Sequence, residues 1–155
     1  MPKRAHLAVG LLAPLCIATF FLSTIITELF GSHAAVAQLK SLIVTPGLWI
    51  MVPLMAAAGG SGMFLARSRK GVLVDAKRKR MPFIAANGLL VLVPCAIVLN
   101  RWAAAGSFDT AFYGVQAIEL VAGAANLTLM GLNARDGLRM AGRLRSSPAA
   151  AAKAH

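Results

Sequence analysis

The sequence predicts an all-α membrane protein, a bundle of four transmembrane helices that run up-down-up-down, with both termini on the cytoplasmic side. Three observations lead to this prediction. Hydrophobic residues make up 58% of the 155 residues and charged residues only 14%, whereas soluble domains carry about 25% charged residues. The apolar residues form four long runs. Nearly all the basic residues flank those runs on one side.

A helix needs about 20 predominantly apolar residues to cross a hydrocarbon core of roughly 30 Å. Four segments meet this requirement, and the expected spans are residues 7–30, 42–66, 82–99 and 108–132. Together they form one transmembrane domain over residues 7–134. We expect residues 1–6 to be a cytoplasmic N-terminus and residues 135–155 to be a basic, partly disordered cytoplasmic tail.

The first span also has features of a cleavable signal peptide, because two basic residues precede it and Ala35-Val36-Ala37 follows it. The apolar region of a signal peptide is about 7–15 residues long. Here the apolar run from Leu7 to Phe30 is longer and ends well before the Ala-x-Ala sequence. An uncleaved first helix is therefore favoured, and cleavage would leave three spans.

Prolines and glycines shape the two middle spans. The second contains Gly59, Gly60 and Gly62, whose spacing from preceding small residues is typical of close helix packing. The third opens at Pro82, where a helix tolerates proline, and Pro94 is expected to bend it.

Polar residues within the fourth span recur with spacings of three and four. Such spacing places side chains along one helix face, so this stripe is expected to point into the bundle. Asp109 is suited to cap the N-terminus of the same helix. The stripe consists of Gln116, Glu119, Gly123, Asn126, Met130 and Asn133.

The basic residues predict the orientation. All of the 16 Lys and Arg residues except Lys40 and Arg101 fall on the side that holds both termini. Cytoplasmic loops carry such an excess, so we expect an integral protein of a bacterial cytoplasmic (inner) membrane. The net charge of +11 is explained in this way, and no nucleic-acid partner is predicted.

The intramembrane polar residues are the candidate site, and Glu119 is its centre. It is expected about 16 Å from the outer end of the fourth helix, and a carboxylate at that depth by default marks a functional site. It could be protonated and donate to an amide, or be ionised and held by a cation. Alternatively, these groups only link helices, and Glu28 only reaches headgroup water or pairs with Lys40. The candidate residues are Glu119, Gln116, Asn126, Asn87 and Glu28.

Three functions remain open. The first is a proton- or cation-coupled carrier or small-molecule-binding bundle that uses the buried carboxylate. The second is a non-catalytic accessory or assembly subunit of a larger membrane complex, and the third is a haem- or quinone-binding redox subunit. Two histidines of one chain, His6 and His33, are 27 residues apart in the sequence and so about 40 Å apart along a helix. They cannot share one haem iron within a monomer.

We predict no cofactor and no metal site, and no motif of an enzyme family is present. The expected surroundings are the lipid bilayer and either further copies of the chain or a partner membrane protein. A four-helix bundle is narrow, so a dimer would be needed to enclose most substrates.

Overall fold

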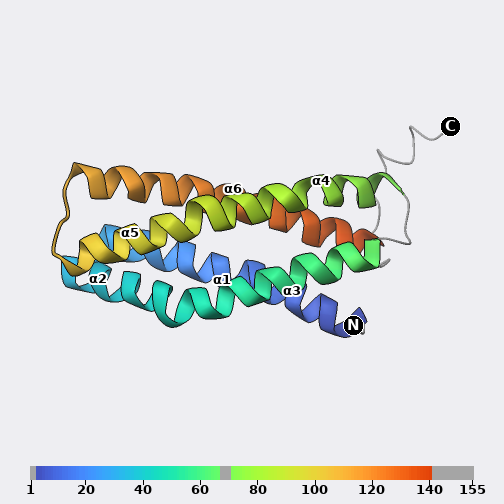
Figure 1. Ribbon diagram of the computed structural model, residues 1–155, viewed down its shortest axis with the longest axis horizontal. Coiled ribbons are helices and arrows are strands. Elements are labelled where there is room, and N and C mark those ends of the chain that lie inside the picture. The colour runs from blue at the N-terminus through green and yellow to red at the C-terminus, as the bar shows by residue number, and fades with distance from the viewer. Residues whose placement is uncertain (1–2, 67–70, 141–155) are drawn as a thin grey trace.

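A computed structural model describes residues 3–66 and 71–140, and its regular elements are all helices (Figure 1). The first run is α1 (Lys3–Phe30). The second joins α2 (His33–Leu42), the π-helical turn η1 (Ile43–Leu48) and α3 (Trp49–Ala66). The third joins α4 (Val72–Asn87), the π-helical turn η2 (Gly88–Leu92) and α5 (Val93–Ala104), and the fourth is α6 (Thr110–Met140).

Each run contains a segment that is long and apolar enough to cross a membrane. These segments are Gly10–Phe30, His33–Phe64, Val72–Ala104 and Thr110–Arg139. The described residues contain no β-strand. The predicted all-α bundle of four membrane-spanning helices is confirmed, and the chain has the architecture of a small integral membrane protein.

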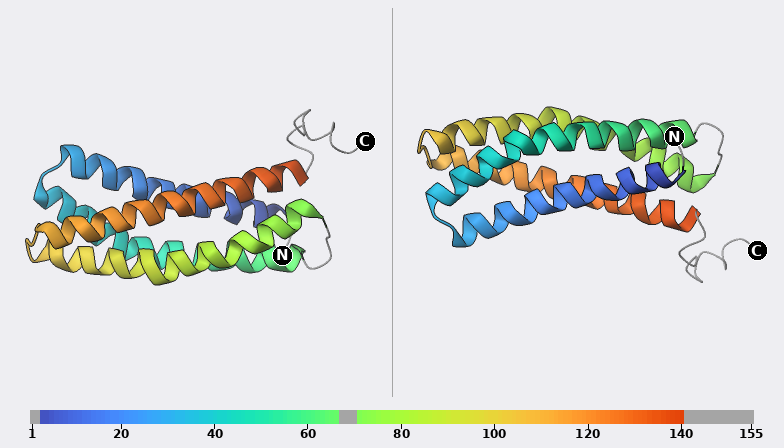
Figure 2. Two further views of the ribbon diagram at one scale, coloured as in Figure 1. Left: turned by 90° about the horizontal axis from the view of Figure 1, so that it is seen from above. Right: turned by 90° about the horizontal axis from the view of Figure 1, so that it is seen from below.

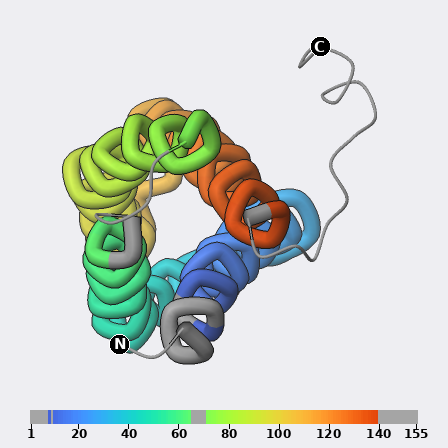
Figure 3. Tube along the Cα trace, turned by 90° about the vertical axis from the view of Figure 1, so that its right-hand side faces the viewer, coloured from blue at the N-terminus to red at the C-terminus, as the bar shows by residue number. Residues whose placement is uncertain are grey.

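The four runs alternate in direction along the bundle. The start of α1, the end of α3, the start of α4 and the end of α6 lie at one end, and the α1–α2 and α5–α6 connections lie at the other (Figures 1 and 2). Viewed end-on, the runs form a closed ring (Figure 3). In this ring α1 packs against α3 and α6, and α5 packs against α2 and α6.

The second run begins nine residues before the expected span, at His33 instead of residue 42. Ser32 has an extended backbone and its hydroxyl accepts a hydrogen bond from the backbone N–H of Ala35 at 3.3 Å. This N-cap starts the helix upstream of the continuous apolar sequence. Lys40, expected in the outer loop, is therefore on a helix and completely buried.

The third and fourth helices also extend beyond the expected spans. The third run begins at Val72, directly after Gly71, whose φ of 141° favours glycine. Pro82 consequently lies inside α4 rather than opening the helix. At the other end, α6 continues to Met140, so residues 135–140 of the expected tail are helical. The rest of that tail, residues 141–155, lies outside the described residues.

Two of the prolines lie at irregular turns. Thr45, which precedes Pro46, has φ −137° and ψ 110° and divides the second run at a kink. Proline disfavours helical angles at the preceding residue, which accounts for this kink. The π-helical turn η2 ends directly before Val93-Pro94, as expected where a proline removes a backbone donor from the helix. The third run is thus irregular directly before Pro94, where a bend was predicted, and Pro94 itself lies in the first turn of α5.

The side chains divide into an apolar exterior and a core that is partly polar. Large hydrophobic side chains such as Leu29, Phe83, Leu90 and Val121 are mostly exposed, which suits contact with lipid. Near the α1–α2 end, a buried apolar cluster joins α2, α5 and α6 through Val36, Leu99, Ala103 and Phe112. The buried polar residues lie in the interior, farther from the α1–α2 end than this cluster. They are Thr24, Lys40, Gln116, Asn126, Asn133 and Asp136.

Close helix contacts occur at glycines other than those expected. A Cβ atom at Gly59 or Gly60 would meet no atom within 4 Å, whereas one at Gly123 would lie 3.2 Å from the ring of Phe21. A Cβ at Gly88 would lie 3.1 Å from the Cε of Met55. Among the described residues, no helix therefore packs closely against Gly59 or Gly60. Gly62 is buried.

Replacing Gly123 with Leu should destabilise the bundle by about 1–3 kcal/mol, because the added side chain must displace the Phe21 ring. Gly131→Leu on the same helix is the matched control, since a Cβ there would meet no atom within 4 Å. Thermal unfolding of both variants in one detergent measures the difference. Equal destabilisation by the two substitutions would contradict the packing of α1 against α6 at Gly123.

Candidate functional site

An ion pair links α2 to α6 inside the bundle. The Nζ of Lys40 lies 2.6 Å from Oε2 of Glu119, and their side chains are 1% and 13% exposed. The amide of Gln116, one turn earlier on α6, donates to the same carboxylate oxygen at 3.0 Å. One glutamate oxygen thus accepts from a lysine and from an amide. Of the two states considered for Glu119, the geometry fits the ionised one, with Lys40 as its cation.

The sequence near each partner explains why these two side chains point inward. Val36 and Lys40 are four residues apart on α2 and both are buried, so the lysine shares the inner face of α2 with an apolar core residue. Glu119 lies on the α6 face that also buries Gln116 and Asn126. Lys40 is seven residues, about 10 Å, from the start of α2, and Glu119 is nine residues, about 14 Å, from the start of α6.

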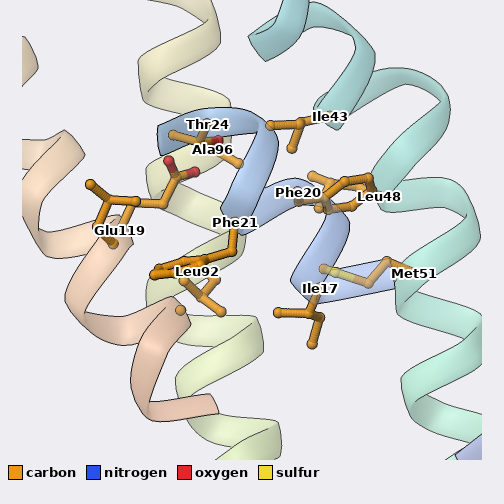
Figure 4. A pocket seen from close by; sticks show the side chains of 12 residues that line it. Ile17, Phe20, Phe21, Thr24, Ile43, Leu48, Met51, Leu92, Ala96 and Glu119 are labelled. Atoms are coloured by element: carbon orange, nitrogen blue, oxygen red, sulfur yellow. The ribbon is translucent and has the colours of Figure 1, made fainter. Parts of the chain in front are cut away.

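A small cavity adjoins the ion pair. Its volume is about 50 Å³, and Glu119 and Thr24 are the polar side chains in its wall. The remaining wall is apolar and comes from α1, both π-helical turns, α3, α5 and α6: Ile17, Phe20, Phe21, Ile43, Leu48, Met51, Leu92, Ala96, Leu120 and Gly123. Figure 4 shows the Glu119 carboxylate directed toward this space, with Phe20 and Phe21 on the α1 side.

Glu28 lies near the Lys40–Glu119 ion pair but is not one of its two members. Its Oε1 atom is buried and has no hydrogen-bond partner among the described residues. The charges of Lys40, Glu119 and His33 act on it. Of the two alternatives for Glu28, headgroup water or Lys40, the structure shows no ion pair with Lys40 among the described residues, because the Lys40 ammonium contacts Glu119.

A second polar contact joins α4 to α6 farther from the α1–α2 end. The amide of Asn87 donates to Oδ1 of Asn126 at 2.9 Å and to the carbonyl of Ala122 at 2.8 Å. Asn126 donates in turn to the carbonyl of Ile84 at 3.4 Å. Both amides therefore have partners within the protein, as hydrocarbon surroundings require.

A third polar cluster lies toward the opposite end of α6. Arg80 on α4 donates to Asp136 at 2.7 Å and to Asn133 at 3.5 Å. The guanidinium of Arg135 lies 3.5 Å from the other oxygen of Asp136, whose side chain is 2% exposed. This ion pair holds the ends of α4 and α6 together, about 25 Å along α6 from Glu119.

The structure brings four of the five predicted site residues into two groups. Gln116 and Glu119 form one group with Lys40, and Asn87 and Asn126 form the other. Glu28 lies beside the first group without a hydrogen bond from its buried oxygen.

Sequence reasoning missed Lys40 and the Arg80–Asp136 pair as partners of the stripe. The N-cap at Ser32 and the spacing of Val36 and Lys40 could have placed the lysine on an inner helix face. Asp136 continues the α6 stripe three residues after Asn133 and could have been included on that spacing. The described residues contain no group of three or more His, Cys, Asp or Glu that could hold a metal ion.

Comparison with known proteins adds no further assignment. No protein-family model, no curated protein and no solved structure matches the chain. Any function must therefore be inferred from the geometry of the site itself.

Lys40→Met alone should destabilise the protein by about 3–5 kcal/mol, because it leaves the Glu119 carboxylate buried without its cation. The double variant Lys40→Met with Glu119→Leu should be much less destabilised, since two apolar side chains replace the pair. Unfolding titrations of the single and double variants measure this coupling. If the effects of the two single substitutions simply add, the ion pair does not exist in the bilayer.

Asn126→Leu should destabilise the bundle by roughly 0.6–1.7 kcal/mol, because it removes the acceptor of Asn87. Thr128→Val on the same helix is the control, since its exposed hydroxyl bonds only to the carbonyl of Ala124. The same unfolding titration measures both variants. A larger effect at Thr128 than at Asn126 would contradict the inward orientation of the stripe.

Proposed function

We propose that this chain is a small proton- or cation-coupled carrier of a bacterial cytoplasmic membrane, and that the Lys40–Glu119 pair is its coupling element. The observation that supports this most is an ion pair held inside a membrane bundle. Two apolar side chains of similar volume would often be at least as stable as such a pair. Ionisable residues within membrane spans commonly belong to ion or proton pathways.

The pair can couple cation binding to a change in helix packing. When Glu119 is ionised, its attraction to Lys40 holds α2 against α6. A proton on Glu119, or a cation that competes with Lys40, cancels that attraction. The two states therefore differ in how strongly α2 is held, which is the differential interaction that a coupled conformational change needs.

The kink at Thr45 supports such a change. It lies five residues after Lys40 and separates α2 from α3 at a residue with non-helical backbone angles. Hinges in proteins are a few residues that absorb changes in φ and ψ. The short helix that carries Lys40 can thus tilt away from α6 while α3 keeps its packing against α1.

The orientation and assembly belong to the same proposal. The excess of Lys and Arg at the end with both termini supports a cytoplasmic location of that end. The cavity of about 50 Å³ suits a small ion rather than a larger metabolite. A bundle of four helices would need a second copy to enclose anything larger.

One observation favours the alternative of an accessory or assembly subunit. A Cβ at Gly59 or Gly60 would meet no atom within 4 Å in residues 3–66 and 71–140, so this small-residue surface is available to a helix of another protein. Purification in mild detergent distinguishes the two functions, because an accessory subunit would be recovered with its complex. Recovery of the chain alone would favour the carrier.

Glu119→Gln should reduce proton flux through the protein in liposomes to the rate of protein-free vesicles, because a neutral amide cannot exchange a proton with Lys40 or solvent. The measurement is the initial rate of a trapped pH-sensitive dye after a pH step, with the membrane potential clamped. Thr128→Val should retain the wild-type rate. Unchanged flux in Glu119→Gln would remove Glu119 from the mechanism.

A further inference from the structure

Three basic side chains surround one carboxylate at the end of the bundle that holds both termini. Nη1 of Arg80 lies 2.7 Å from Oδ2 of Asp136, and Nε of Arg135 lies 3.5 Å from Oδ1 of the same residue. The charge of Asp136 also acts on Lys77, whose Nζ lies 3.9 Å from the position that a Cβ atom on Gly137 would take. With all four side chains ionised, the formal charge of this basic cluster, Lys77, Arg80, Arg135 and Asp136, is +2.

Among the described residues, no second carboxylate balances the surplus charge. The other acidic residue near this end is Asp75, which is exposed on α4, and the charge that acts on Lys77 is that of Asp136. The remaining acidic residues of the chain lie toward the α1–α2 end: Glu28, Asp109 and Glu119. The basic cluster therefore attracts an anion from outside the chain.

The three basic side chains also have hydrogen-bond donors to spare. A guanidinium carries five N–H donors, and the contacts of Arg80 with Asp136 and Asn133 both use Nη1. Arg135 contacts Asp136 through Nε and Nη2. Lys77 is half-buried and makes no hydrogen bond with any described residue. The side chains of Arg80 and Arg135 are 24% and 48% exposed, so a molecule at the surface of the bundle can reach their donors.

The basic cluster lies at the depth of lipid headgroups. The start of α4 and the end of α6 lie together at one end of the bundle (Figure 1). Asp136 is 26 residues, about 39 Å, from the start of α6 at Thr110. The hydrocarbon core is roughly 30 Å thick, and the headgroup layers extend the bilayer to about 40–45 Å. A helix that begins at one membrane surface therefore carries Asp136 past the hydrocarbon and into the headgroups of the opposite leaflet.

We propose that Lys77, Arg80 and Arg135 form a binding site for the phosphate group of an anionic membrane lipid such as phosphatidylglycerol. The N–H donors would bind the phosphate oxygens through charge-assisted hydrogen bonds. Basic pockets between transmembrane helices bind lipid headgroups in this way. The acyl chains would lie against the apolar exterior of the bundle, where side chains such as Phe83 on α4 are exposed. This site is independent of the proposed carrier function.

A free phosphate ion offers the same oxygen acceptors as the lipid but has no acyl chains. The depth of the basic cluster favours the lipid, because headgroup phosphates are concentrated in that layer of the bilayer. The apolar surface beside the cluster also favours a ligand with an apolar part.

The experiment measures equilibrium binding of radiolabelled phosphatidylglycerol to the full-length protein in micelles of an uncharged detergent. We expect saturable binding of one phosphatidylglycerol per chain. Unlabelled phosphatidylcholine, which has no net charge, should compete at least about fivefold less well than unlabelled phosphatidylglycerol. Inorganic phosphate should not displace the lipid. Displacement by inorganic phosphate would overturn the assignment to a lipid and assign the site to a free phosphate ion. Absence of saturable binding, or equal competition by the two lipids, would overturn the site itself.

Matched variants locate the site. Lys77→Gln should raise the dissociation constant of phosphatidylglycerol about fivefold, which is the typical contribution of one basic residue to the attraction of anionic lipid. Lys79→Gln is the control, because Lys79 is exposed on the same helix and its replacement removes the same charge. Arg135→Gln should weaken binding by a similar factor and provides a second test if Lys77→Gln does not fold. Its control is Arg78→Gln, since Arg78 is also exposed on α4.

The controls separate a defined site from a general effect of net charge. Binding that is weakened by Lys77→Gln or Arg135→Gln, and unchanged in both controls, would support the site. Equal weakening in the variants and their controls would contradict it, because any loss of positive charge would then have the same effect.

Discussion

The Lys40–Glu119 ion pair constrains the arrangement of α2 and α6, because neither charge can be left alone in a bundle whose exterior is apolar. A charged side chain facing hydrocarbon is strongly unfavourable, and water cannot reach a lysine that is 1% exposed. The two helices must therefore present these side chains to each other. Packing of α2 against α5, and of α1 against α6, then closes the ring around the pair.

The other interior polar contacts extend the same constraint along α6. Asn126 is held by Asn87, and Asp136 by Arg80, so the inner face of α6 has partners on other helices from the α1–α2 end to the end that holds the termini. These contacts differ in their surroundings. The two farther contacts join α4 to α6. The ion pair instead adjoins a cavity and a kinked helix, and two buried oxygens near it have no hydrogen-bond partner among the described residues.

The sequence predicted the parts of this structure that depend on hydrocarbon surroundings alone. These parts are the four helical runs, the placement of both termini at one end of the bundle, and the inward-facing stripe from Gln116 to Asn133. They could be predicted because the length of an apolar segment and the periodicity of a helix are local properties of the sequence. It did not predict Lys40 as the partner of Glu119, since a capping serine started the helix before the apolar sequence began. Gly59 and Gly60 have no close neighbour among the described residues, because small residues permit close packing but do not specify which helix approaches.

The most direct test is the distance between the two charged groups in a lipid bilayer. Solid-state NMR of protein labelled with ¹⁵N at lysine and ¹³C at glutamate measures dipolar coupling between the Lys40 Nζ and the Glu119 carboxylate carbon. A strong coupling that disappears in Glu119→Gln is expected from the contact of 2.6 Å. A Lys40 signal without any coupling to a carboxylate would show that the bundle does not contain this pair.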